Sequence, residues 1–422
     1  MGIKFRLTLM NFLQYAVWGS YLTSMGTLLF GIGMADKIGL FYAMQGIVSL
    51  FMPALIGIVA DRWVPAQRLL GFCHLMAALF LMVAAYAIGA TAPNYDYWLI
   101  FGCYSLSVAF YMPTIALSNS VAYSILESNH MDTVKVFPPI RVWGTVGFIC
   151  AMLLCDFSGF QHSNMQFYQS AVLGVLLAVY AFTLPACPVN RSQEKKSIVE
   201  ALGLRAFSLF KQKKMALFFI FSMLLGVSLQ ITNGFANPFI TSFRDIPEYA
   251  STFGANHANA LISLSQVSET LCILLIPFCL KRFGIKNVML MAMFAWVLRF
   301  GLFGVGNPGS GVWMFILSMI VYGIAFDFFN ISGSLFVNNE TDTTIRSSAQ
   351  GLFMMMTNGI GATIGTLGAQ AVVNRVVFSQ SEPAAQVAGW SEAWLIFAAY
   401  ALVVAVLFAL VFRYKHNPEA HA

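Results

Sequence analysis

Two carboxylic acids, Glu269 and Asp327, stand in almost wholly apolar stretches of this sequence. The other 15 of the 17 acids fall in predicted loops, helix ends or tails. An ionisable side chain at the centre of a membrane helix costs at least ~2.5–3.5 kcal/mol, so it usually faces a cavity or a partner. Burial disfavours the charged form of a carboxyl group, so either acid could bind and release a proton. The structural alternative is a buried ion pair that holds helices together.

Neutral polar side chains recur beside these acids at helical spacing. The sets are Gln230 and Asn233, Gln266 and Glu269, and Asp327, Asn330 and Ser334. Residues three or four apart share one face of a helix. Amide groups both donate and accept hydrogen bonds, which suits sugar hydroxyls and the edge of a heterocyclic base. These faces predict a site for a small polar solute, and the oxygens near Asp327 leave a sodium ion open as an alternative to the proton.

A third set, Arg141, Thr145 and Phe148, has the spacing i, i+4 and i+7. Arg141 either binds the solute or anchors a gate, because Ile140-Arg141 matches Ile345-Arg346 later in the chain. Phe148 and Phe326 could offer flat faces to a base, although helix packing alone also explains aromatic residues in a membrane span.

The composition predicts the elements that must position these residues. Of 422 residues, 59% are hydrophobic and only 9% are charged, and the mean hydropathy is +0.75. Soluble domains carry about 25% charged residues. Lipid must therefore replace water, and the long continuous apolar runs favour helices over a barrel. We expect an all-α membrane protein, and the net charge of +6, with no soluble domain to carry it, does not indicate nucleic-acid binding.

Twelve apolar segments are long enough to cross a bilayer, which takes about 20 residues per helix. The first, preceded by Lys4 and Arg6, is interpreted as a retained span and not as a signal peptide. The predicted spans are 8–30, 39–59, 69–91, 97–121, 141–156, 167–186, 215–241, 258–280, 286–305, 311–337, 348–373 and 390–412.

One long polar stretch, 187–214, divides the chain. It predicts an N-terminal six-helix half over 1–186, a cytoplasmic linker over 187–214, and a C-terminal six-helix half with a short cytoplasmic tail over 215–422. With both termini in the cytoplasm, 18 of the 23 Lys and Arg residues lie inside, and Lys37, Arg244 and Arg375 lie outside. This asymmetry is the one that the positive-inside rule predicts.

Short motifs recur at similar offsets in the two halves, such as Ala109-Phe110 and Ala325-Phe326. A duplicated six-helix unit is typical of secondary transporters, whose solute site lies near the midplane between repeats that give alternating access. Neither H-E-x-x-H nor G-x-S-x-G occurs, so we expect no enzyme, and without a G-x-x-x-x-G-K-S/T loop an ATP-driven pump is disfavoured. The absence of repeated charge rings argues against a channel. Seven cysteines without a C-x-x-C pair indicate free thiols and no metal site.

Several strings resemble known families. Gly57-Ile-Val-Ala-Asp61-Arg62 is similar to the loop signature of the major facilitator superfamily, although it continues with Trp63 where that signature has Gly. Longer strings resemble the bacterial nucleoside:proton symporters. They are FPPIRVWGTVGF (137–148), FFIFSMLLGVSLQITN (218–233), SLSQVSET (263–270), KRFGIKNVMLM (281–291), SMIVYGIAFDFFNISGS (318–334) and SSAQGLFMMMTNG (347–359).

The resemblance implies a major facilitator fold that imports nucleosides by proton symport through the bacterial inner membrane. It implies a functional monomer without cofactor or nucleic acid. A carrier of sugars or other polyols and a sodium-coupled nucleoside carrier stay open as alternatives. We place Asp61 and Arg62 at a gate and the proton on Asp327 or Glu269. Arg299 is interpreted as a structural or snorkelling cation outside the site. The predicted substrate-binding residues are Arg141, Thr145, Phe148, Gln230, Asn233, Gln266, Glu269, Phe326 and Asp327.

Overall fold

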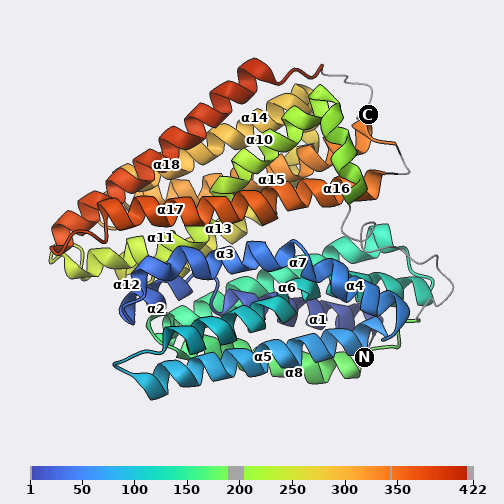
Figure 1. Cartoon of the computed structure of the whole chain (residues 1–422), viewed down its shortest axis with the longest axis horizontal. Helices are drawn as coiled ribbons and strands as arrows, with labels where there is room; N and C mark the ends of the chain where they lie inside the picture. Colours follow the sequence, from blue (N-terminus) through green and yellow to red (C-terminus); the bar gives the residue numbers. More distant parts are fainter. Residues whose placement is uncertain (1, 189–203, 343–344, 416–422) are drawn as a thin grey trace. The chain divides into compact units, whose positions relative to one another are not determined.

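The computed structural model describes residues 2–188, 204–342 and 345–415, and every regular element in these ranges is helical. This confirms the all-α prediction (Figure 1). The longer helices are α1 (Ile3–Gly19), α2 (Met25–Gly31), α3 (Ile38–Ser49), α4 (Met52–Arg62), α5 (Ala66–Thr91), α6 (Tyr97–Ser128), α7 (Thr133–Phe157), α8 (Met165–Phe182), α10 (Lys213–Leu229), α11 (Ile231–Ser242), α13 (Ala258–Cys272), α14 (Ile276–Val305), α15 (Val312–Glu340), α16 (Arg346–Met354), α17 (Ala362–Val376) and α18 (Pro383–Val411). Short turns are η1 (Ala35–Lys37), η2 (Phe160–His162), η3 (Leu204–Lys211), η4 (Phe243–Asp245), α12 (Phe253–Asn256), η5 (Ile273–Leu275) and the π-helix η6 (Met355–Gly361).

Eight segments of the described chain are long and apolar enough to cross a membrane, or nine if the bent pair Ala35–Ser49 and Met52–Ala60 forms one span. One of these segments, Ala258–Val305, has 48 residues. At 1.5 Å per residue it would extend over about 70 Å, more than twice the roughly 30 Å hydrocarbon core. Gly284 interrupts it with a φ of 78°. Length and apolarity alone therefore do not fix how often the chain crosses.

The surface of α18 shows what solvent surrounds these helices. Val403, Leu407 and Leu410 expose 57%, 45% and 70% of their side chains along one helix. A continuous apolar face of this kind is stable against lipid chains and unfavourable in water.

The described chain forms two compact units. Unit 1 contains Met1–Met34 and Met44–Leu202, and unit 2 contains Ala35–Ala43 and Gly203–Ala422. The short segment Ala35–Ala43 joins unit 2 through Gln370, whose Oε1 accepts from the Gly39 backbone N–H at 2.5 Å and whose Nε2 donates to the Ala35 carbonyl at 3.0 Å. Much of the predicted linker, residues 189–203, lies outside the described residues.

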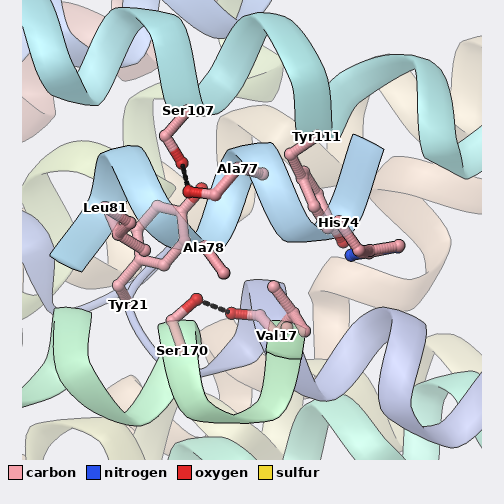
Figure 2. Close-up of a pocket in the computed structure, with 10 residues that line it drawn as sticks. Val17, Tyr21, His74, Ala77, Ala78, Leu81, Ser107, Tyr111 and Ser170 are labelled. Atoms are coloured by element: carbon pink, nitrogen blue, oxygen red, sulfur yellow. Dashed lines mark hydrogen bonds between the residues drawn. The ribbon is translucent and has the colours of Figure 1, made fainter. Parts of the chain in front are cut away.

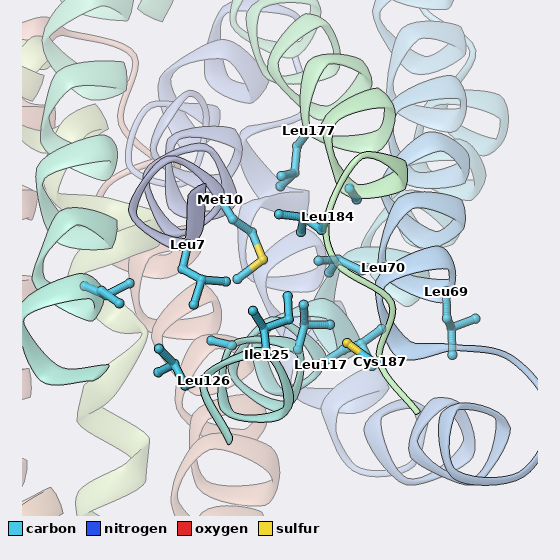
Figure 3. Packing of buried hydrophobic residues seen from close by; sticks show 14 of the residues in the cluster. Leu7, Met10, Leu69, Leu70, Leu117, Ile125, Leu126, Leu177, Leu184 and Cys187 are labelled. Atoms are coloured by element: carbon cyan, nitrogen blue, oxygen red, sulfur yellow. The ribbon is translucent and has the colours of Figure 1, made fainter. Parts of the chain in front are cut away.

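In unit 1, α1 packs along α7, and α5 packs against both α6 and α8. Gly147 permits the first of these contacts, because a Cβ there would lie 2.1 Å from the Phe12 carbonyl oxygen. Figure 3 shows the apolar cluster that holds α1, α5, α6 and α8 together. Its labelled members include Leu7, Met10, Leu70, Leu117, Ile125 and Leu177.

In unit 2, α14 packs against α15 and α18, α13 packs against α15, and α10 packs against η6 and α17. Gly365 permits the last contact, because a Cβ there would lie 2.0 Å from the Val227 carbonyl oxygen. A side chain at either Gly147 or Gly365 would force two helix backbones apart.

Candidate functional site

The two predicted acids of unit 2 lie on neighbouring helices, Glu269 on α13 and Asp327 on α15. Gly323 lets these helices approach closely, because a Cβ there would lie 2.6 Å from the Ser268 carbonyl oxygen. The Ser268 hydroxyl also donates to the Ile320 carbonyl. The contact between α13 and α15 brings the two carboxyl groups within electrostatic range of each other.

Asp327 is the more buried of these acids, with 6% of its surface exposed. Its Oδ2 atom has no hydrogen-bond partner among the described residues. A buried polar group normally has such a partner, and an exception calls for a proton, a ligand or a water. No basic side chain of the described chain pairs with Asp327, so the ion-pair alternative has no support at this residue.

The predicted amide pair Gln230 and Asn233 lies where α10 gives way to α11. The Asn233 Nδ2 donates to the Gln230 Oε1 at 2.8 Å, so the two side chains act together. Further along α11, the Asn237 Nδ2 donates to the Asn259 Oδ1 on α13 at 2.8 Å. This buried bond fixes α11 beside the helix that carries Gln266 and Glu269.

Tyr322 was not among the predicted site residues. Its ring stacks on the Phe326 ring at a centroid distance of 5.6 Å and an interplanar angle of 15°. Its hydroxyl is within hydrogen-bonding reach of the Gln266 side chain. Tyr322 precedes Phe326 by four residues, so the two share one helix face. This spacing is the sequence signal that could have added Tyr322 to the predicted site.

Ser334, the last residue of the predicted stripe with Asp327 and Asn330, bonds to the next helix. Its hydroxyl donates to the Gln350 Oε1 on α16 at 3.0 Å, and the Gln350 Nε2 donates back to the Ser334 carbonyl at 2.7 Å. These two bonds connect α15 to α16.

In unit 1, Arg141, Thr145 and Phe148 follow one another along α7, the helix that packs on α1. The Arg141 Cζ lies 4.0 Å from the centroid of the Tyr15 ring, a cation–π contact. The Phe148 ring meets the Trp18 ring edge-on at 6.3 Å. The side chains of Arg141 and Phe148 are thus placed by two aromatic residues of α1.

The two matched arginines occupy different positions in their helices. Arg141 lies well inside α7, whose first residue is Thr133, whereas Arg346 is the first residue of α16. The Arg346 Nη2 donates to the Thr341 carbonyl at 3.1 Å in the preceding turn. The predicted gate residues Asp61 and Arg62 end α4, and their side chains lie outside what the structure describes.

Comparisons with known proteins identify the family. The model of the family described as "Nucleoside H+ symporter" matches residues 1–417. The chain belongs to the nucleoside H⁺ symporter family. It is 47% identical to the nucleoside permease NupG of Escherichia coli (strain K12), over 99% of this chain and 97% of that protein. It is also 47% identical to the xanthosine permease of the same strain, over 99% and 98%. The crystal structure of nucleoside transporter NupG superimposes with a TM-score of 0.89 at 46% identity, covering 98% of this chain and 100% of that one.

A cavity inside unit 1 is too small for a nucleoside. It lies between α1, α5, α6 and α8 and is lined by Tyr21, His74, Tyr111 and Ser170 among others (Figure 2). Its volume of about 10 Å³ suits roughly one water molecule, so a nucleoside cannot enter. The His74 Nδ1 has no partner among the described residues, and a water in this cavity would supply one.

The neighbouring hydrogen bonds explain how these polar side chains are stabilised in the apolar interior of unit 1. The His74 Nε2 lies 2.6 Å from the Gln14 Oε1, the Gln14 Nε2 donates to the Thr114 Oγ1 at 2.8 Å, and the Tyr111 hydroxyl donates to the Gln14 carbonyl at 2.8 Å. This group, called here the His74 network, was also absent from the sequence-based prediction. Its members come from α1, α5 and α6, so no periodicity within one helix reveals them.

Proposed function

We propose that this chain imports nucleosides together with protons through the bacterial inner membrane. The observation that carries the proposal is the family match over residues 1–417, supported by 47% identity to proteins named nucleoside permease and xanthosine permease. It is also supported by two carboxyl groups on packed helices, one of which has a buried oxygen, the Asp327 Oδ2, without a hydrogen-bond partner among the described residues.

The substrate-binding residues that we propose are found in each unit. Unit 1 supplies Arg141, Thr145 and Phe148, and unit 2 supplies Gln230, Asn233, Gln266, Glu269, Phe326 and Asp327. To these we add Tyr322, because it stacks on Phe326 and reaches Gln266. The aromatic pair offers a face for a base, and the amides and acids offer partners for ribose hydroxyls and base edges.

The coupling residue that we propose is Asp327, with Glu269 as its electrostatic partner. Two like charges in a low-dielectric interior repel each other, so a proton on one carboxyl group relieves the repulsion. When the proton leaves the carboxyl group and enters the cytoplasm, the repulsion would return. Sodium is the alternative ion.

We also propose twelve crossings with both termini in the cytoplasm. The helix runs α1–α2, α3–α4, α10–α11 and α16–α17 each count as one crossing. The run Ala258–Val305 counts as two crossings, separated by the break at Gly284. The test of this topology is cysteine labelling, and the exposed Cys150 is first replaced so that it does not react. Single cysteines near Asn94 and Ser310 should then react with an impermeant thiol reagent from outside intact cells, and one near Ser192 should not. Labelling at Ser192 contradicts this topology.

The proposed function is tested by uptake of labelled uridine and adenosine into proteoliposomes of the purified protein. An imposed pH gradient, acid outside, should drive accumulation above equilibrium, and unlabelled nucleosides should compete while sugars should not. Competition by sugars favours a polyol carrier, and dependence on a sodium gradient favours sodium coupling. A protein that catalyses neither uptake nor counterflow of any nucleoside contradicts the proposal. Mass measurement of the detergent-solubilised protein tests the expected monomer.

A further inference from the structure

Arg299 is a cation in the interior of unit 2. It belongs to α14, and only 1% of its surface is exposed, so of the two predicted alternatives, a structural or a snorkelling cation, the burial favours the structural one. A charged group in such a place is costly unless its environment compensates it. The buried guanidinium therefore either has a functional role or is stabilised by the groups around it.

The polar contacts of Arg299 reach both helices that carry the predicted acids. Its Nη1 donates to the Ser318 carbonyl on α15 at 2.7 Å and lies 3.5 Å from the Ser265 hydroxyl on α13. The Ser318 hydroxyl donates back to the Arg299 carbonyl at 3.0 Å. Ser265 immediately precedes Gln266, and Ser318 lies one turn before Tyr322.

The remaining face of the guanidinium lies against aromatic rings. Its Cζ is 4.6 Å from the centroid of the Tyr322 ring and 5.2 Å from that of Phe303. Tyr322 in turn stacks on Phe326, and the Trp296 ring closes on Tyr322 edge-on at 6.0 Å. Arg299, Tyr322 and Phe326 thus form a continuous contact that begins at a buried cation and ends at a predicted substrate residue.

We propose that Arg299 is a positioning residue for the substrate site: it holds the Tyr322 ring against Phe326, so that the two stacked rings present a fixed face to the base of the substrate. This role rests on the proposed function, because it assumes a ligand with a flat heterocycle. An arginine suits the role better than a lysine. Its planar guanidinium stacks on a ring while its N–H groups donate in the plane, whereas an ammonium is a compact charge that does not do both.

The test compares Arg299→Lys with the wild-type protein in binding of labelled adenosine and uridine and in counterflow. We expect the dissociation constant and KM to rise about tenfold, as for a lost desolvated cation–π contact, while the maximal rate and the thermal midpoint stay close to wild type. Arg282→Lys is the matched control, because Arg282 lies in α14 just before the break at Gly284, is exposed, and has its Cζ 5.8 Å from the Phe283 ring. It should bind as wild type does. Unchanged binding by Arg299→Lys overturns the proposal.

A double-mutant cycle with Tyr322→Leu separates positioning from a general structural role. If Arg299 acts through the Tyr322 ring, the double variant should bind no more weakly than Tyr322→Leu alone, whereas independent roles give additive losses. Additive losses therefore contradict the proposal. Should Arg299→Lys not fold, Tyr322→Phe and Tyr322→Leu provide the test, because only Phe keeps the ring. Equal losses in these two variants also contradict the proposal.

Wild-type measurements keep the two proposals distinguishable. If the wild-type protein binds no nucleoside, the proposed function fails. If the wild type binds and Arg299→Lys binds equally well, only the positioning role fails.

Discussion

The two units bury polar groups of different kinds. In unit 1 the His74 network consists of neutral side chains and a backbone carbonyl from three helices that bond to one another. In unit 2 the interior holds Asp327, with an oxygen that has no described partner, and Arg299, a cation whose polar contacts are neutral oxygens. A hydrogen-bonded network of neutral groups makes a core specific and rigid. Buried ionisable groups without an ion-pair partner, such as Asp327 and Arg299, are costly to the folded protein, so they indicate a role in binding a ligand or a proton.

The backbone packing of the two units is nevertheless similar. In unit 1, α1 meets α7 at Gly147, where the Phe12 carbonyl takes the space of a side chain. In unit 2, α10 meets α17 at Gly365, where the Val227 carbonyl does the same. These are the first and fifth predicted segments of each half. Similar backbone packing therefore carries different polar groups, and the two acids proposed for coupling both lie in unit 2.

The largest effect should come from Asp327→Asn, because an amide mimics the protonated acid and cannot release the proton. Uptake driven by a pH gradient should vanish, while exchange of nucleoside without a gradient survives in part. The matched control is Asp156→Asn. Asp156 is a buried acid of unit 1 whose Oδ1 accepts from the Gln161 Nε2 at 3.1 Å, and an asparagine oxygen can accept the same bond.

These two variants are compared in proteoliposomes with and without an imposed pH gradient, at neutral and acidic external pH. Undiminished accumulation by Asp327→Asn would break the comparison between the units and would transfer coupling to Glu269 or to another cation. Loss of accumulation in Asp156→Asn alone would move the charged chemistry to unit 1.

Intermediate effects should follow removal of the polar side chains that we assign to substrate. Gln230→Ala, Asn233→Ala, Gln266→Ala and Glu269→Gln should each weaken nucleoside binding. A lost hydrogen bond to a buried partner costs about 1–3 kcal/mol, or roughly 5- to 150-fold in affinity. Binding of labelled nucleoside to purified protein measures this, and the amount of folded protein in the membrane is the control. Normal binding by all four variants would place the site elsewhere.

Arg141→Ala extends this test to unit 1. If the guanidinium over Tyr15 contacts substrate, affinity should fall by a similar factor. A lower transport rate with unchanged affinity would instead assign Arg141 to a gate.

The smallest effect on transport should come from His74→Leu, which leaves the Gln14 Oε1 without its partner. We expect a loss of about 1–3 kcal/mol in stability, seen as a lower thermal midpoint in detergent. Uptake per folded molecule and its dependence on pH should not change. Ser107→Ala, which removes a bond to the Ala77 carbonyl in the same region, should cost less. A changed pH profile in His74→Leu would contradict a purely structural role for the His74 network.

Much of this protein follows from its sequence alone. Sparse charge and long apolar runs exclude a soluble fold, because water cannot solvate such a surface. Long matching strings predicted the family, which the comparisons confirm. The acids Glu269 and Asp327 stood out because ionisable groups are rare in apolar spans. Their roles, like those of the other predicted site residues, stay predictions that the experiments above test.

Only the tertiary structure decided which residues meet. The close approach at Gly323, the stacking of Tyr322 on Phe326, the contacts of Arg299 and the pairing of Ser334 with Gln350 each depend on how one helix is rotated and how closely it lies to another. Periodicity assigns residues to a face of their own helix, but it does not say which helix that face touches. The composition determined that lipid surrounds the protein and that its elements are helices, because both follow from local transfer free energies. The site's internal contacts required the fold, because they join residues that are distant in the chain.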